Sequence, residues 1–319
     1  MKQITLSDVA KAAGVSIGTA SRAMNNRSRV SAPARRSVLD AARELGYLRP
    51  SRRTRVIAIL APTLEIRALA DYFLLMFNAF RCEIHDRGYR AVTLSREDFP
   101  LLNEWPVDGA VSLDYIGEIS RQFPRTSNIP LVCCNDRPNH LENIYTIRSN
   151  SRKILREVVE HLAGFGHFRV GLTHFQESRE QTDKPDYGGF FREAMTAHGL
   201  AGGAFYRPYS SALPMHEAVA MLLREGITAL IAVDHSVEAD RLLKLSGRRI
   251  PEDISLVAGD TMAAVRMFPR HTTMAIDYPA VARTAVDVLE TVWNGGTIRQ
   301  DIFIDSRLNI RESTGPAPE

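Results

Sequence analysis

The sequence has few cysteines, no long apolar run and no leader-like start, and each absence excludes a class of protein. Its three cysteines, two of them adjacent at Cys133 and Cys134, provide neither a disulfide framework nor a spaced metal site. No apolar run reaches the ~18 residues of a membrane span. Asp8 and Lys11 interrupt the stretch where a signal peptide needs apolar residues, so we expect a cytoplasmic protein without membrane contact.

The composition is that of a globular protein, but its charge is unevenly distributed. The 319 residues are 45% hydrophobic and 24% charged, with a net charge of +3. Residues 1–55 contain twelve Lys or Arg against three acids, whereas the rest of the chain contains 28 bases against 34 acids. A small basic module on an acidic body is typical of proteins that bind a polyanion. The alternative is a basic tail that only aids solubility.

The first 48 residues predict three short helices. Thr5 and Asp8 are spaced as a capping box for a helix that ends at Gly14. Ser16 can cap a second helix that runs to about Met24, and Ser31 can cap a third. Two short helices joined by a tight glycine turn and braced by a third follow the helix-turn-helix plan.

The second helix presents the residues expected to contact DNA. Arg22 can bond guanine through two hydrogen bonds, and Ile17 can touch a thymine methyl group. Gly18 costs a helix about 1 kcal/mol relative to Ala, which is explained if the helix must approach another surface closely. Each residue taken alone could instead belong to a solvated face. The predicted DNA contacts are Thr5, Ser16, Ile17, Gly18, Thr19, Ser21, Arg22, Asn25, Ser31, Arg52 and Arg53.

From Val56 onward, short apolar runs alternate with amphipathic stretches. Strands are expected at 56–60, 90–94, 110–113, 131–134, 170–173, 230–233 and 255–257. Helices are expected at 71–87, 152–164, 190–198, 215–225, 237–245 and 280–293. This alternation predicts parallel sheets covered on both faces. A faint internal repeat, in which 86–89 precedes 107–114 much as 197–200 precedes 227–234, predicts two doubly wound halves with ligands at the carboxyl ends of the strands.

The N-terminal run from Thr5 to Ser16, followed by Thr19, Ser21-Arg22 and Asn25, is similar to the headpiece of the lac repressor (LacI/GalR) family. Further matches are Val30-Ser31, Arg35, Leu45-Gly46-Tyr47 and the segments 161–167 and 250–255. The resemblance implies an all-α helix-turn-helix headpiece followed by an α/β effector domain that is periplasmic-binding-protein-like. It also implies a dimeric regulator of transcription that binds an operator.

We therefore expect a DNA-binding headpiece at 1–48, a short basic linker at 49–55 and an effector-binding and dimerisation domain at 56–319. The family usually has a hinge helix in the linker, with a leucine that enters the minor groove. Here the segment from Tyr47 to Arg55 leads directly into the strand at Val56, so the hinge helix is expected to be missing. Arg52 and Arg53 either follow DNA phosphates or are simply solvated.

The resemblance also indicates effector ligands in the body. Asp260 takes the place of a family ligand-binding acid, and Asn150 matches an asparagine near the first crossover. The position where the family has an arginine is Tyr187, or Asp186 if the alignment is shifted by one residue. The loss of that arginine favours a neutral effector, a sugar or polyol. Asp234 and Asp260 could instead cap helices, and Tyr72 and Tyr187 could be half-buried packing residues. The predicted ligand set is Asp71, Tyr72, Asp114, Asn150, Tyr187, Asp234 and Asp260.

The sequence thus predicts a repressor whose partners are a double-stranded DNA operator, a small-molecule effector and a second copy of the chain. No cofactor, metal or catalytic residue is expected. The G-x-S-x-G pattern at 14–18 follows a predicted helix, whereas a nucleophile elbow follows a strand, so the chain is not expected to be an enzyme. Two alternatives are a small-molecule binding protein with a vestigial headpiece, and a regulator with a degenerate cleft that a protein partner controls.

Overall fold

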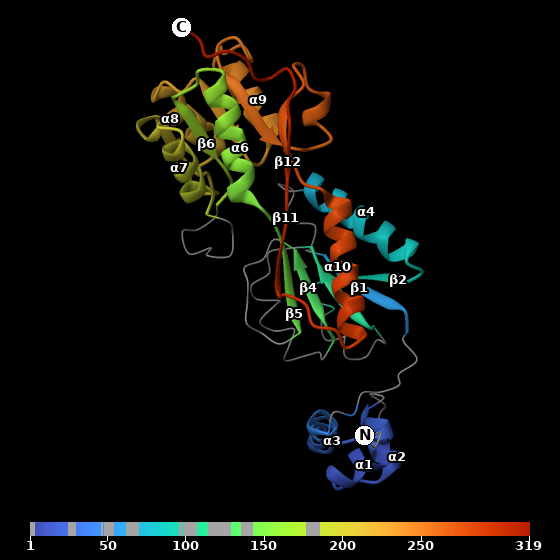
Figure 1. The fold of residues 1–319 in the computed structure, drawn as a ribbon. Coiled ribbons are helices and arrows are strands. Elements are labelled where there is room, and N and C mark those ends of the chain that lie inside the picture. Colours follow the sequence, from blue (N-terminus) through green and yellow to red (C-terminus); the bar gives the residue numbers. More distant parts are fainter. Residues whose placement is uncertain are drawn as a thin grey trace.

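The computed structural model describes residues 4–24, 30–45, 47, 54–61, 70–95, 98, 107–113, 129–134, 143–176 and 186–319. It contains a helical headpiece and two α/β subdomains, each built on one six-stranded sheet (Figure 1). No helix of this described part is both long and apolar enough to cross a membrane.

The headpiece consists of α1 (Leu6–Ala12), α2 (Ile17–Met24) and α3 (Ala32–Glu44). Gly14 has φ of +65°, so it makes the left-handed turn between α1 and α2 that a larger residue would adopt only under strain. Small and β-branched side chains from all three helices form the core: Val9, Ala10, Ala20, Ala23, Val38, Ala41 and Ala42. The predicted helix-turn-helix arrangement is therefore present.

The first α/β subdomain carries the sheet order β11-β5-β4-β3-β1-β2, and all of its strand pairs are parallel. Its helices α4 and α10 lie side by side against one face of the sheet (Figure 1). The elements are β1 (Val56–Leu60), α4 (Ala70–Asp86), β2 (Arg90–Leu94), β3 (Gly109–Ser112), β4 (Leu131–Cys134), β5 (Ile144–Ser149), α10 (Tyr278–Trp293) and β11 (Asp301–Ile304).

The second subdomain carries the order β12-β10-β9-β8-β6-β7, in which only the β10–β12 pair is antiparallel. Helices α6 and α7 pack on one face of this sheet, and α8 and α9 on the other. The elements are α6 (Ser151–Gly164), β6 (Val170–Thr173), α7 (Tyr187–Ala197), η3 (Ala201–Gly203), β7 (Ala204–Tyr206), α8 (Met215–Arg224), β8 (Ala229–Ala232), α9 (Ser236–Leu245), β9 (Ser255–Gly259), η4 (Ala264–Arg266), β10 (Thr272–Ala275) and β12 (Arg307–Asn309).

The chain crosses between the subdomains after β5, after β10 and after β11 (Figure 1). Each crossing leaves a strand at its carboxyl end, so the carboxyl-end edges of both sheets face the crossings. At this point Asp305 accepts a hydrogen bond from Asn150 Nδ2 (3.1 Å) and pairs with Lys153 Nζ (2.5 Å). The fold class predicted from the sequence is confirmed by this architecture.

Most predicted elements are present, with small shifts of their ends. The helix expected from 190 begins at Tyr187, because the Asp186 carboxylate accepts a hydrogen bond from Gly189 N–H (2.8 Å) and caps it. Strands expected to include Leu113 and Val233 end at Ser112 and Ala232. The strands β5, β7, β10, β11 and β12 had no assignment from the apolar pattern.

Candidate DNA interface and effector site

The second helix of the headpiece begins with a side-chain cap. Ser16 Oγ accepts a hydrogen bond from Thr19 N–H (3.1 Å) and lies 2.9 Å from Thr19 Oγ1. Ala20 and Ala23 face the core, so the exposed side of the helix carries Ile17, Gly18 and Arg22. The Ile17 side chain is 54% exposed, which is high for an apolar residue on a small helical domain. The helix thus presents an apolar group and a guanidinium together.

Gly18 is not required by the headpiece's own packing. A Cβ atom added there would lie 3.9 Å from Ser16 Oγ and 4.0 Å from Arg22 Nη2, which is ordinary van der Waals contact. An alanine would fit and would favour the helix, so the glycine leaves room for a surface outside the chain to approach closely, and that contact stays a prediction. A DNA backbone or base edge in the major groove is such a surface.

Thr5 and Ser31 stand at the starts of α1 and α3. Asp8 Oδ2 accepts from Thr5 N–H (2.8 Å) and from Thr5 Oγ1 (2.7 Å), so the acidic half of the predicted capping box is present. Ser31 Oγ accepts a hydrogen bond from Ala34 N–H (3.4 Å). Both residues therefore hold helix starts, and their contacts with phosphate stay predictions, as does that of Ser21. Asn25, Arg52 and Arg53 lie outside the described residues.

The parallel strands of the second sheet, β6, β7, β8, β9 and β10, end at the edge that faces the crossings. Asp234 follows β8, and its Oδ2 accepts a hydrogen bond from Phe175 N–H (2.8 Å) after β6. The N-cap residue of α9 is His235, so Asp234 does not cap this helix. The hydrogen bond observed for Asp234 is the one from Phe175 N–H. A charged oxygen acceptor is thereby fixed where parallel α/β sheets commonly bind ligands.

Tyr187 lies in a stack of rings beside this edge. The His174 ring is 5.0 Å from the Tyr187 ring and 5.7 Å from the Tyr206 ring, nearly parallel to the latter. Burial, and then the charge of Asp234, raise the pKa of Tyr187 to about 12, so its hydroxyl keeps its proton at neutral pH. Tyr187 thus places an uncharged hydroxyl group, which is also hydrogen-bonded to Ser151, beside this edge.

His174, Tyr206 and Gln176 belong to this cluster but were missed from the sequence. His174 is buried, its Nε2 lies 2.7 Å from Tyr206 Oη, and Tyr206 Oη lies 3.1 Å from Gln176 Oε1. A Cβ at Gly188 would lie 2.7 Å from the Tyr206 ring, so this glycine gives the ring its place. The available signal was the run of polar and aromatic residues directly after the apolar strand β6.

Asp260 and Asn150 have clear partners within the chain. Asp260 Oδ1 accepts a hydrogen bond from Thr273 Oγ1 and lies 3.6 Å from Arg311 Nη2. Asn150 caps α6 by accepting from Lys153 N–H (3.3 Å), in addition to its bond with Asp305. These contacts explain both residues as parts of the fold, and their roles as effector ligands stay predictions.

Tyr72 packs at the start of α4, with its ring 5.4 Å from Phe73 and 6.0 Å from Tyr278. Its half-buried position agrees with the packing alternative. The side chain of Asp71 and the whole of Asp114 lie outside what the structure describes. Within the described part of the chain, no group of three or more His, Cys, Asp or Glu residues is placed to hold a metal ion.

The comparisons with known proteins agree with this geometry. Residues 5–50 match the model for bacterial regulatory proteins of the lacI family, and residues 159–314 match the periplasmic binding protein-like domain. The HTH-type transcriptional regulator MalR of Streptomyces coelicolor is 26% identical over 98% of this chain and 97% of its own length. This relative is a transcription regulator and not an enzyme, which confirms that expectation for the chain.

Two solved structures show the same fold. A complex of the transcriptional regulator CelR with cellobiose has a TM-score of 0.67 at 24% identity, over 97% of this chain and 99% of that one. The lac repressor dimer bound to operator and the anti-inducer ONPF has a TM-score of 0.65 at 24% identity, over 98% of this chain and 100% of that one. These two structures show the fold. The lacI-family match at 5–50, the periplasmic binding protein-like match at 159–314 and the match to MalR over nearly the whole chain place this protein in the LacI family of DNA-binding transcriptional regulators.

Proposed function

We propose that the protein is a dimeric repressor that binds operator DNA through α2 and whose DNA affinity changes when a neutral sugar or polyol binds between the two subdomains. The observation that carries the proposal is the exposed face of α2, which has Ile17, Gly18 and Arg22 on one side. The packing of the headpiece itself does not require a glycine at position 18. An arginine aimed at guanine and an apolar group aimed at thymine provide sequence readout in the major groove.

The proposed effector class follows from the groups at the carboxyl-end edge. Tyr187 and Tyr206 supply ring faces, and both hydroxyls stay protonated because burial raises each pKa to about 12. Asp234 supplies a carboxylate acceptor. Rings that cover apolar sugar faces, with a carboxylate that accepts from hydroxyls, suit a neutral polyhydroxyl ligand. The cellobiose named for CelR is a ligand of this class.

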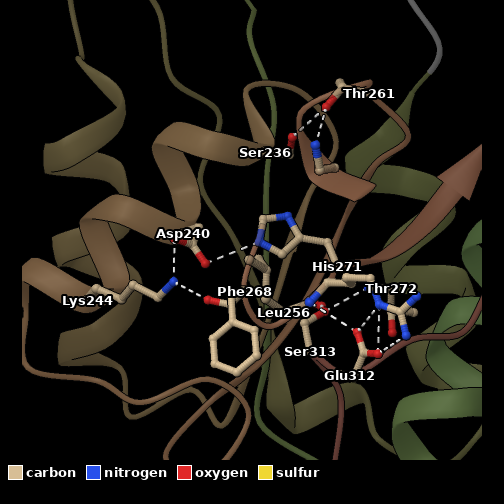
Figure 2. A network of polar contacts seen from close by, with 12 residues as sticks. Ser236, Asp240, Lys244, Leu256, Thr261, Phe268, His271, Thr272, Glu312 and Ser313 are labelled. Carbon is tan, nitrogen blue, oxygen red and sulfur yellow. Dashed lines mark hydrogen bonds and ion pairs between the residues drawn. The ribbon is translucent and has the colours of Figure 1, made fainter. Parts of the chain in front are cut away.

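The proposed dimer surface lies on α9 and the loop after β9. Its exposed apolar side chains are Val237, Leu245, Met262 and Phe268, of which Phe268 is 91% exposed. Figure 2 shows what holds this surface together: Lys244 Nζ on α9 donates to the Phe268 carbonyl (2.9 Å) and pairs with Asp240 (2.9 Å). Asp240 in turn lies 3.1 Å from the buried His271 Nε2. An exposed apolar set on a rigid frame fits a second copy of the chain.

Replacing Phe268 by Asp tests the dimer surface. We expect the variant to sediment as a monomer at micromolar concentration and to bind duplex DNA far more weakly, because one headpiece buries too little surface for high affinity. Phe168 is also exposed but lies outside this surface, so Phe168→Asp is the matched control and should remain dimeric. A dimeric Phe268→Asp variant would refute the surface.

The effector is tested by a thermal-shift screen with sugars, polyols, sugar acids, sugar phosphates and nucleobases. A ligand at one hundred times its dissociation constant adds about 2.7 kcal/mol and raises the unfolding midpoint by several degrees. We expect a neutral sugar or polyol to produce the shift and to change affinity for a duplex selected from a random library. A shift with sugar acids or phosphates would refute the class, and no shift with intact DNA binding would favour control by a protein partner.

A further inference from the structure

The point where the chain enters the body is fixed by one carboxylate. Asp108 Oδ1 accepts hydrogen bonds from Thr54 N–H (3.1 Å) and Thr54 Oγ1 (3.0 Å), and Asp108 Oδ2 accepts from Arg55 N–H (2.8 Å). Charge-assisted bonds from two consecutive backbone amides leave these residues little freedom. We call Asp108, Thr54 and Arg55 the Asp108 clamp.

Arg55 is held on its other sides as well. Its φ is +60°, in the left-handed region that a residue with a side chain adopts only when its surroundings demand it. Its carbonyl accepts a hydrogen bond from Arg90 N–H (2.7 Å), and its guanidinium lies 5.4 Å from the Tyr89 ring. A Cβ at Gly88 would lie 3.0 Å from Arg55 Nη2, so the glycine leaves room for this side chain.

Asp108 is itself anchored to the last turn of α10. Its carbonyl accepts a hydrogen bond from Trp293 Nε1 (2.8 Å), and its N–H donates to Val56 O (2.8 Å). Helix α10 starts at Tyr278, just after the crossing from β10, and ends at Trp293. One 16-residue helix therefore runs from the crossings, where the subdomains meet, to the Asp108 clamp.

The other end of the linker is fixed on the headpiece. Tyr47 packs against the headpiece core, and its N–H donates to Ala42 O (2.9 Å). Only residues 48–53 separate Tyr47 from Thr54 in the sequence. Seven steps of fully extended chain span at most about 25 Å, so each headpiece can move only a short distance from its clamp.

We propose that the Asp108 clamp positions the headpieces and thereby determines which separation of half-sites in the operator the dimer accepts. The argument rests on the dimeric DNA binding proposed above. Once one headpiece is bound, binding of the second is intramolecular, and its effective concentration falls steeply when the tether cannot span the distance. Because the linker is short and starts from a fixed point, the protein selects the separation of the two half-sites in addition to their base sequence.

The experiment measures affinity by fluorescence anisotropy on duplexes that differ in half-site separation. Full-length protein first selects a duplex from a random library, and the selected centre is then lengthened or shortened by one and two base pairs. We expect the wild type to lose about tenfold or more in affinity when two base pairs are added. Asp108→Ala should bind the selected duplex within about threefold of wild type and lose less than about threefold on the lengthened one.

Asp98→Ala is the matched control. Asp98 accepts hydrogen bonds from Ser95 N–H (3.1 Å) and Ser95 Oγ (3.0 Å), which is the same chemistry away from the linker, so this variant should keep the full spacing penalty. A second variant carries Gly-Ser-Gly-Ser inserted between Arg52 and Arg53, which lengthens the tether and leaves the clamp intact. It should also reduce the penalty, because the proposal requires the tether that starts at the clamp to be short.

A wild type that binds all spacings equally would overturn the proposal, as would a folded Asp108→Ala variant with an unchanged penalty. If Asp108→Ala does not fold, an insertion variant with an unchanged penalty would overturn it. A wild type that selects no duplex at all would instead refute the proposed function. The two failures are therefore distinguishable.

Discussion

The exposed face of α2 and the carboxyl-end edge of the second sheet use their polar residues in opposite ways. On α2, Arg22 is exposed and Gly18 could be replaced by alanine without a clash. At the sheet edge, His174, Tyr206 and Asp260 are bonded to neighbours within the chain. From this difference we expect that the proposed DNA contacts of α2 can be altered while the fold is kept, whereas changes at the proposed effector edge should alter ligand binding and stability together.

The largest expected effect on stability is at the ring stack. Tyr206→Phe removes the hydroxyl that lies between His174 and Gln176 and leaves the buried His174 Nε2 without that partner. We expect the free energy of unfolding to fall by about 1–3 kcal/mol, with DNA binding in the absence of effector unchanged. Chemical denaturation measures the first quantity, and anisotropy with a selected duplex measures the second.

Tyr89→Phe serves as the control for that change. It removes a bond to Glu290 (3.0 Å), but this carboxylate keeps its ion pair with Arg87 (2.7 Å), so we expect a loss of at most about 1 kcal/mol. Equal losses in the two variants would contradict the view that the ring stack is the more tightly coupled site.

A smaller effect of opposite sign is expected at Gly18. Gly18→Ala should raise the free energy of unfolding of the headpiece by about 0.5–1 kcal/mol, because alanine favours a helix, and should still weaken DNA binding. Gly164 also lies in a helix, and a Cβ there would have no neighbour within 4 Å, so Gly164→Ala is the control. It should stabilise the protein and leave DNA affinity unchanged. Tighter DNA binding by Gly18→Ala would show that the helix does not approach DNA closely.

The smallest effect concerns pH and belongs to the body. Burial lowers the pKa of His161, His167 and His271 below the ordinary 6.5, so each binds a proton more weakly in the folded protein than in the unfolded chain. The unfolded chain takes up these protons as the pH falls below about 6.5, whereas the folded chain resists them, so stability should decrease on acidification. The unfolding midpoint at pH 7.5 and at pH 5.5 checks the sign.

A His167 variant identifies one contributor to this pH dependence. His167 Nε2 lies 2.9 Å from the Gly315 carbonyl, which can only accept, so this nitrogen carries the hydrogen in the neutral ring. His167→Gln keeps a donor without a titratable group, and its midpoint should fall less between the two pH values. A midpoint that rises on acidification in the wild type would show that other groups dominate.

The sequence predicted the headpiece in detail because its signals are local. Ser16, Gly14 and the apolar spacing act within one or two turns of a helix, and the structure has the cap and the turn where they were expected. The buried strands β1, β4 and β6 were predicted with their observed ends, because their apolar runs are nearly continuous. The edge strand β2 was also predicted with its observed ends, although only Leu94 of it is buried. The strand β11 was not predicted, because its partner strand β5 lies about 150 residues earlier in the sequence. Asp301 of β11 accepts a hydrogen bond from Arg148 of β5.

The effector edge could be predicted only in part, because its contacts join distant segments. Nothing near Asp260 in the sequence indicates that Arg311 and Thr273 contact it. Likewise, the stack of His174 with Tyr187 and Tyr206 forms only when three separate elements meet. The residue types in the sequence predicted where the strands end. The contacts that each side chain makes at those ends depend on tertiary packing.

The most direct test of the account is the sequence discrimination of Arg22 variants. Affinities of the wild type, Arg22→Ala, Arg22→Lys and the control Arg36→Ala are measured on a selected duplex and on its single-base-pair variants. We predict that Arg22→Ala loses about 1–3 kcal/mol on the selected duplex and its preference at one base pair, and that Arg22→Lys keeps more affinity but not that preference. Equal weakening on every sequence, or no effect at all, would contradict base recognition by α2.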